Sequence, residues 1–244
     1  KQTIDAHEVK LEAGKEDPEI FEIPEPTVPL GITVRIDQKD DLATDNQAAL
    51  IVNPRKAVKT LLVSEGNVFL KNGIEVDPNV TLVAIAPAEF KSVAGYDVVV
   101  FDGFAPATLP DGNYMFVNCN NELSPAAPLE ESQNQTVIDP NKTHPVMRYV
   151  DFGNLHWTTM RSGKTKAWGQ ELASSENGSA IVVGEKGKTR SMWTGFNLDV
   201  AHGQFPLSVF YPIFLSNSVR WLAHSDDDAS SQIRTGQAIA LDVP

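Results

Sequence analysis

The sequence predicts an α/β protein in which a doubly wound sheet follows an N-terminal segment of β structure. Residues 58 to 63 form a nearly continuous apolar run, which is typical of strands buried on both faces of a parallel sheet. Further runs of this kind alternate with short helix signals, and this order favours right-handed βαβ crossovers. Before residue 55 the pattern is different, because apolar and polar residues alternate and prolines are frequent. We therefore expect a flavodoxin-like sheet preceded by a partial β-sandwich.

The N-terminal segment, residues 1 to 54, is predicted to be part of an Ig-like β-sandwich. Ile32, Val34 and Ile36 alternate with polar residues, which is the period of a strand with one buried face. A second strand is expected from Gln47 to Val52. Four prolines between residues 18 and 29 suit edge strands and turns. Asn53-Pro54 then marks a domain boundary.

The next segment is expected to supply four strands of the parallel sheet. A short helix is predicted from residue 67 to about residue 71, with Ser64 or Asn67 as its N-cap. The stretch "AEFKSVAG" is expected to form a short helical turn. The four strands are predicted at residues 58–63, 79–87, 96–103 and 113–118.

The last part of the α/β domain, which we place at residues 55 to 226, contains a predicted hairpin and a closing helix. Residues 181–183 and 190–196 flank the turn at 185–188. The helix is expected to begin near Pro206 and to kink or restart at Pro212. Residues 120–143 are polar, proline-rich and aperiodic, which predicts a long exposed loop. Residues 227–244 are predicted to be a tail or the start of another β segment.

Composition excludes several functional classes. A net charge of −12 and a pI near 4.8 argue against binding to nucleic acid or to an anionic membrane surface. The single cysteine permits no internal disulfide, and the five histidines are too scattered to predict a metal site. "GEKGKT" does not meet the spacing of a phosphate-binding loop. We therefore predict no cofactor and no metal.

Candidate site residues follow the predicted strands at the edge where doubly wound sheets bind ligands. Ser64 and Glu65 follow the first strand, Asp102 ends the third, and Asn118 and Cys119 follow the fourth. Turn formation alone explains Asp102-Gly103. Cys119 lacks the flanking glycines of a nucleophile elbow and a histidine followed by an acidic partner. The five residues are therefore predicted to line a crevice, and none is assigned a catalytic role.

The order of several segments resembles the bacterial BatA-like membrane proteins. These segments are "DLATDNQAALIV", "KTLLVSEGNVFL", "YDVVVFDGFAPATLPDGNYMFVN", "HPVMRYVDFGNLHW" and "GEKGKTRSMWTGFNLDVAHGQFPLSVFYPIFLSNSVRWL". The resemblance covers nearly the whole chain, and its motifs include "VFDG", "HPV" and "G-F-x-L". It implies a class I glutamine-amidotransferase-like domain from a von Willebrand A domain protein. The Cys-His-Glu triad of active amidotransferases has no counterpart in this sequence.

The resemblance implies a non-catalytic scaffold or protein-binding module within a membrane-anchored bacterial cell-envelope protein. Its expected location is extracytoplasmic, its expected partners are other envelope proteins, and it would meet the membrane only through segments outside this chain. One alternative is a divergent amidotransferase-like hydrolase that uses Cys119 or Asp102. Another is a sugar-binding domain resembling the trehalose-utilisation proteins, with tryptophan side chains as stacking platforms.

Overall fold

The computed structural model divides the chain into two compact units. Lys1–Arg55 belongs to the first unit, and Lys56–Asp226 forms the second. The structure describes residues 3–10, 14, 19, 21, 23, 26–38, 46–52, 54, 56–153 and 155–224. The predicted C-terminal tail, residues 227–244, lies outside these ranges.

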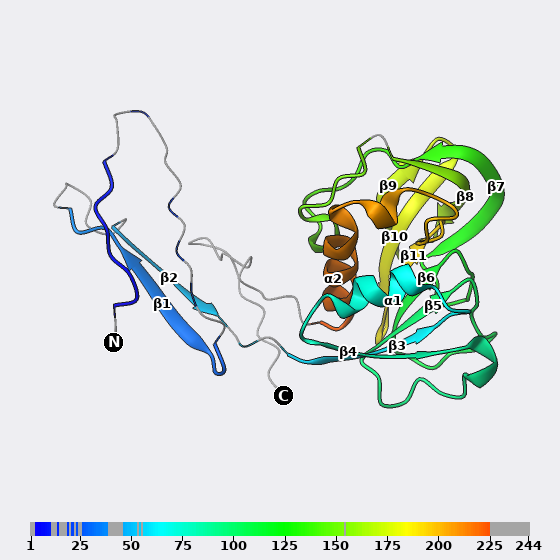
Figure 1. Cartoon of the computed structure of the whole chain (residues 1–244), viewed down its shortest axis with the longest axis horizontal. Coiled ribbons are helices and arrows are strands. Elements are labelled where there is room, and N and C mark those ends of the chain that lie inside the picture. Colours follow the sequence, from blue (N-terminus) through cyan, green and yellow to red (C-terminus); the bar gives the residue numbers. More distant parts are fainter. Residues whose placement is uncertain are drawn as a thin grey trace. The chain divides into compact units, whose positions relative to one another are not determined.

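The first unit contains a two-stranded antiparallel ladder (Figure 1). β1 (Leu30–Arg35) pairs with β2 (Gln47–Val52), from Leu30 opposite Val52 to Arg35 opposite Gln47. Both strands were predicted from the sequence. The β-sandwich around them stays a prediction, because these are the two strands described in this unit.

The described part of Lys56–Asp226 forms a nine-stranded sheet with a parallel half and an antiparallel half. The parallel half has the order β4-β3-β5-β6-β11. Its strands are β3 (Val58–Val63), β4 (Val80–Ile85), β5 (Val98–Asp102), β6 (Asn113–Val117) and β11 (Thr189–Thr194). The four predicted parallel strands are confirmed at these positions.

The antiparallel half continues from β11 through the hairpin that the sequence predicted. The order is β11-β10-β8-β7, and β9 also pairs with β10. The strands are β7 (Ala126–Thr136), β8 (His156–Thr165), β9 (Gly169–Ser175) and β10 (Gly178–Lys186).

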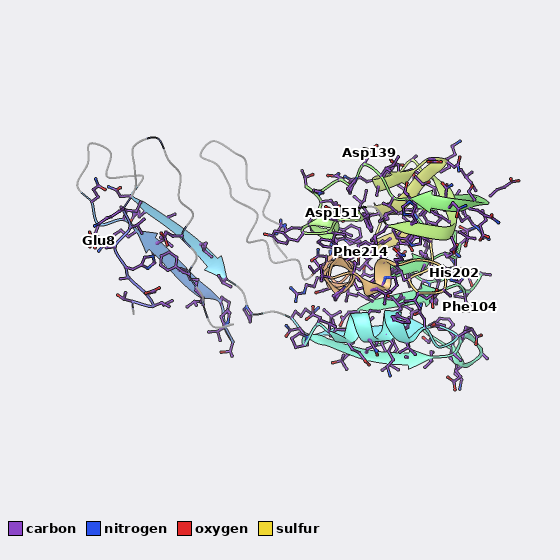
Figure 2. All side chains as sticks on the ribbon, turned by 45° about the horizontal axis from the view of Figure 1, so that its top comes forward. Glu8, Phe104, Asp139, Asp151, His202 and Phe214 are labelled. Carbon is purple, nitrogen blue, oxygen red and sulfur yellow. The ribbon has the colours of Figure 1, made fainter. Side chains whose placement is uncertain are left out.

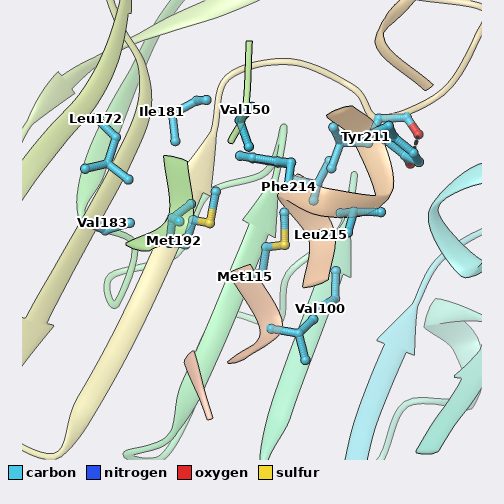
Figure 3. Packing of buried hydrophobic residues seen from close by; sticks show 14 of the residues in the cluster. Val100, Met115, Val150, Leu172, Ile181, Val183, Met192, Tyr211, Phe214 and Leu215 are labelled. Atoms are coloured by element: carbon cyan, nitrogen blue, oxygen red, sulfur yellow. Dashed lines mark hydrogen bonds between the residues drawn. The ribbon is translucent and has the colours of Figure 1, made fainter. Parts of the chain in front are cut away.

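The two α-helices in the described part of this unit pack on one face of the sheet. Figure 3 shows Phe214 and Leu215 of α2 (Phe210–Leu222) beside Val100, Met115 and Met192 of the sheet, all buried. α1 (Val68–Glu75) adds two buried side chains to the same cluster. Burial of each such side chain contributes roughly 1.5–3 kcal/mol, so this face forms the main core.

The opposite face is covered by loops and a 3-10 turn, Pro87–Glu89. Phe101 stacks on Phe116 at 5.9 Å between ring centroids, and Phe90 meets the edge of Phe101 from the loop that follows the turn. Helices on both faces, as in a doubly wound sheet, are not found in the described part of this unit. The fold is therefore mixed α/β with a large mixed sheet, half parallel and half antiparallel, and few helices.

Helix boundaries follow from the backbone donors at each helix start. Asn67 Oδ1 accepts a hydrogen bond from the Leu70 amide at 3.0 Å, which confirms Asn67 as the N-cap of α1. The closing helix starts at Phe210, so the start predicted near Pro206 is wrong; Pro206 lies in a 3-10 turn. Pro212 falls in the first turn of α2, where no intrahelical N–H bond is needed, so the helix continues through it.

The predicted long loop at 120–143 is wrong over nearly half of its length. β7 occupies residues 126–136 and forms the edge of the antiparallel half, so polar side chains meet solvent along it. Pro128 lies beside the register shift between Pro128 and Glu131, and an edge strand tolerates a proline there. An exposed edge strand carries neither an apolar run nor a strict alternation, which is why the sequence pattern resembled a loop.

Candidate ligand-binding cleft

A cleft of about 460 Å³ opens at the carboxyl ends of β3 and β5. Parallel sheets place ligand sites at this edge, where strands end and loops diverge. Four segments that are separate in the sequence line the cleft. They are Ser64, Glu65 and Asn67; Pro87; Asp102, Gly103 and Phe104; and Asn197 and Asp199. Phe104 and His202, the latter paired with Asp199, both lie toward this end of the unit (Figure 2).

Ser64 and Asp102 form the floor of the cleft as a hydrogen-bonded pair. The Ser64 hydroxyl donates to Asp102 Oδ2 at 2.7 Å. The same hydroxyl oxygen accepts from the amides of Gly66 at 3.3 Å and Asn67 at 3.1 Å. Its proton and its lone pairs are thus engaged in the turn that leads into α1. Ser64 therefore holds the carboxylate and the turn in place.

The Asp102 carboxyl is only partly accessible, and this changes its acidity. Burial raises the pKa of Asp102, although hydrogen bonds from Ser64 and Asn67 act in the opposite direction. The negative charge of Asp199 raises the pKa further, and His202 counteracts it. A carboxyl group whose pKa is raised in a cleft is a candidate functional residue, so Asp102 is one here.

Asp199 and His202 form a second pair beside the cleft. His202 Nδ1 lies 2.7 Å from Asp199 Oδ1, which also accepts from the amides of Ala201 and His202. Sequence reasoning missed this pair, because it sought an acidic residue directly after a histidine. The signal was present as Asp-x-x-His in "NLDVAHG", a spacing at which a turn brings the two side chains together.

Asn118 supports the cleft without lining it. Its Nδ2 donates to Asn197 Oδ1 at 3.0 Å, and Asn197 lines the cleft. Asn118 has a φ of 46°, in the left-handed region that asparagine tolerates better than most residues. Its Oδ1 is buried and has no hydrogen-bond partner among the described residues. The end of β6 is therefore a tight, polar turn that fixes Asn197.

Cys119 does not line the cleft. Its side chain is buried, with 8% of the residue exposed, and its thiol donates to the Phe101 carbonyl oxygen at 3.5 Å. Burial raises the pKa of Cys119 to about 12, and the negative charge of Asp102 acts in the same direction. Of the five residues predicted at the crevice, Ser64, Glu65 and Asp102 line it, Asn118 supports it, and Cys119 lies behind it.

Cys119 is expected to resist alkylation in the folded protein. We expect iodoacetamide at pH 7.5 to alkylate Cys119 in the folded protein at less than about one hundredth of the rate measured for the same thiol in 6 M guanidinium. The reason is that the thiolate is scarce and enclosed in the folded protein. Mass spectrometry of the intact chain over time measures both rates. Rapid native labelling at Cys119 would contradict this burial.

The tryptophans do not provide a stacking platform at the cleft. Trp157, Trp193 and Trp221 are buried in the two cores. Trp168 is partly covered by the ammonium groups of Lys166 and Lys186, each about 6 Å from its ring centroid. Within the described ranges, no group of three or more His, Cys, Asp or Glu side chains is arranged to hold a metal ion.

Comparisons with known proteins support the fold. No family model matches the sequence, and no curated protein matches it. Among solved structures, the cytoplasmic protein STM1381 from Salmonella typhimurium LT2 aligns with a TM-score of 0.55 and 12% identity, covering 80% of this chain and 96% of that one. The cytoplasmic protein STM3548 from Salmonella typhimurium aligns with a TM-score of 0.54 and 11% identity, covering 79% of this chain and 95% of that one.

These comparisons also correct one prediction. Both Salmonella proteins are named as cytoplasmic, which contradicts the extracytoplasmic, membrane-tethered location expected from the sequence, and that prediction is wrong. No helix in the described ranges is both long and apolar enough to cross a membrane.

Proposed function

We propose that this chain is a non-catalytic binding module whose cleft takes a small group rich in hydrogen-bond donors. The observation that supports this most directly is the crowding of acceptors around one opening. Glu65, Asp102 and Asp199 contribute carboxyl groups. The Asn197 amide oxygen already accepts from Asn118. Ionised carboxylates only accept hydrogen bonds, so a bound group must donate them, as an ammonium, a guanidinium or a hydroxyl does. A lysine or arginine side chain of a partner protein meets this requirement.

The hydrogen-bond pattern favours binding over catalysis. A nucleophilic serine needs a base that accepts its proton and a free lone pair for attack. Ser64 gives its proton to Asp102 and its lone pairs to two backbone amides. Among the described residues, the hydrogen-bond partner of the His202 ring is Asp199, and no hydroxyl or thiol donates to it. The site is therefore better suited to holding a ligand than to activating a nucleophile.

The finer fold and the family remain parts of this proposal. A class I glutamine-amidotransferase-like, flavodoxin-like ancestry and a relationship to BatA-like proteins rest on the sequence motifs, such as "VFDG" and "HPV". Loss of the family's triad agrees with a binding role, because a fold can persist after its chemistry is lost.

A divergent hydrolase that uses Asp102 is the second candidate. The raised pKa of Asp102 within a cleft is the observation that favours it, because general acids are often carboxyl groups of this kind. Cys119, the other residue considered for this role, is disfavoured by its burial. An ester and amide panel tests the hydrolase, and turnover abolished by Asp102→Asn would replace the binding proposal.

Binding is tested by amide chemical-shift titration of the full chain. N-acetyl-lysine methylamide and N-acetyl-arginine methylamide serve as cationic probes, trehalose as a hydroxyl probe and citrate as an anionic control. We expect saturable shifts at Asn67, Gly103 and Asn197 with at least one donor probe and none with citrate. Asp102→Asn should abolish them, while Asp139→Asn, an exposed control, should not. Equal shifts with citrate, or none with any donor, would refute the proposal.

Asp102→Asn is also expected to stabilise the fold by about 1 kcal/mol at pH 7, or about 2–4 °C in Tm. The folded-state pKa of Asp102 is raised, so its contribution to stability is fully present below the unfolded pKa and is lost as pH rises through the folded value. The asparagine variant does not undergo this loss. In thermal melts from pH 3 to pH 7, the Tm of the variant should exceed the Tm of the parent by an amount that grows as the pH rises. A variant less stable than the parent at pH 7 would contradict this.

A further inference from the structure

The cleft carries more negative charge than the side chains around it neutralise. Glu65, Asp102 and Asp199 supply its three carboxyl groups. Within the described ranges, no lysine, arginine or histidine lies close enough to Glu65 or Asp102 to form an ion pair. Asp199 has one such neighbour, the His202 imidazole at 2.7 Å, which offsets the carboxylate only when it is protonated. Two of the three carboxyl groups therefore lack a counter-charge.

This uncompensated charge favours a cationic ligand over a neutral hydroxyl group. The charge of Asp199 raises the pKa of Asp102, so the two carboxyl groups repel each other, although His202 acts in the opposite direction. A bound cation attracts both groups, whereas a hydroxyl donates one hydrogen bond and leaves the repulsion in place. Asp102 is partly buried, and charges interact more strongly where water is partly excluded. The donor groups that suit the cleft are thereby narrowed to an ammonium and a guanidinium.

The apolar part of the lining distinguishes between these two cations. Phe104 and Pro87 line the cleft together with the carboxyl groups. The Phe104 ring meets the buried Phe101 ring in an edge-on contact, with 6.4 Å between the ring centroids, so packing holds it in place. A guanidinium is planar and weakly hydrated and stacks on aromatic rings, whereas an ammonium is compact and strongly hydrated. A cleft that combines carboxyl groups with an aromatic ring therefore favours the guanidinium.

The origin of the acceptors points to the same group. Glu65 follows β3, Asp102 ends β5 and Asp199 follows β11, so the three carboxyl groups enter the cleft from separate segments. An ammonium carries three N–H donors on one nitrogen, whereas a guanidinium carries five on three nitrogens. Donors spread over three nitrogens can bond to carboxyl groups that come from different segments.

We propose that the cleft binds the guanidinium group of an arginine side chain in preference to the ammonium group of a lysine side chain. Asp102 is the hydrogen-bond acceptor in this assignment, and Phe104 is the stacking surface. The inference rests on the proposed function, because it names which donor group the cleft takes. A protein arginine and a free guanidinium compound present the same chemistry, and the probes below distinguish them.

Chemical-shift titration of the full chain with matched probes measures this preference. The probes are the N-acetyl methylamides of arginine, lysine and citrulline, and citrulline has nearly the shape of arginine without its charge. We expect the Kd of the arginine probe to be lower than that of the lysine probe by about fivefold or more, and lower than that of the citrulline probe by about tenfold or more. Lysine or citrulline binding as tightly as arginine would overturn the inference.

Methylguanidinium, as a fourth probe, identifies the source of the group. A Kd equal to that of the arginine probe would support a free guanidinium compound as the ligand. Weaker binding than the arginine probe would support an arginine within a protein, because the rest of the residue then contributes to affinity.

Phe104→Leu tests the stacking surface, because it keeps an apolar side chain and removes the ring. The ratio of the lysine Kd to the arginine Kd should fall by about threefold or more. Phe21→Leu, the same change in the first unit, is the matched control and should keep the parental ratio. A ratio that Phe104→Leu leaves unchanged would overturn the inference. Saturable binding of lysine alone would overturn it and leave the binding proposal intact, whereas no binding by any donor probe would refute both.

Discussion

Replacing Arg220 with alanine is expected to lower the free energy of unfolding of the second unit by about 3–5 kcal/mol. Arg220 Nε donates to Asp77 Oδ2 at 2.7 Å, and the Asp77 side chain is only 1% exposed. Ser216 Oγ donates to the same oxygen at 2.9 Å. These bonds join the segment after α1 to the last turns of α2. The variant leaves a buried carboxylate without its counter-charge, which costs more than the pair contributes.

Urea unfolding followed by circular dichroism measures this loss, with Ser216→Ala as the control. The control removes one hydrogen bond to the carboxylate and should cost about 1 kcal/mol. Burial acts to raise the pKa of Asp77, but the bonds from Arg220, Asn79 and Ser216 lower it overall. Its stabilisation is thus present above the unfolded pKa and is lost as pH falls through the folded value. Equal losses for Arg220→Ala and Ser216→Ala would show that the ion pair contributes little.

Gly195→Ala is expected to have an effect of similar size and also to damage the cleft. A Cβ at Gly195 would lie 1.9 Å from the Arg161 carbonyl oxygen, far closer than atoms can approach. The Arg161 amide donates to the Gly195 carbonyl oxygen at 2.6 Å, so the two backbones are held together there. The strand end must move, and we expect a cost of about 3 kcal/mol or more. Asn197 follows two residues later, so its position changes as well.

The control for Gly195→Ala is Gly31→Ala, the same change in a strand where no atom lies within 4 Å of the new Cβ. It should change stability by no more than about 1 kcal/mol. Chemical-shift titration with the lysine and arginine probes then reports on the cleft. A Gly195→Ala protein with parental stability and parental shifts would mean that the β8–β11 junction adapts freely.

Sequence reasoning located β3, β5 and β6 well, because these strands are buried on both faces and their apolar runs need no partner to be recognised. β4 is partly exposed, but its apolar run was recognised in the same way. The same reasoning missed β7, β8 and β9, whose residues alternate between solvent and core in patterns broken by a register shift and by close packing. Gly163 illustrates this, since it occupies a strand interior only because the Trp193 ring lies against it. Such a contact between distant residues leaves no local signal.

The same distinction separates the parts of the cleft that were predicted from those that were not. Ser64, Glu65 and Asp102 lie at the ends of adjacent parallel strands, so strand order alone brings them together. Asn197 and Asp199 follow β11, whose place beside β6 depends on pairing between residues far apart in the chain. Cys119 is near the correct edge, but its side chain turns into the core, and an orientation of that kind depends on packing.

The cleft is assembled from the segments 64–67, 102–104 and 197–199 together with Pro87, which only the folded chain brings together. An unfolded chain has no such site, so occupancy and folding are thermodynamically linked. A ligand at one hundred times its Kd adds about 2.7 kcal/mol to the free energy of unfolding, and the melting temperature then depends on ligand concentration. A thermal screen can therefore identify what this cleft binds without any prior assay of activity.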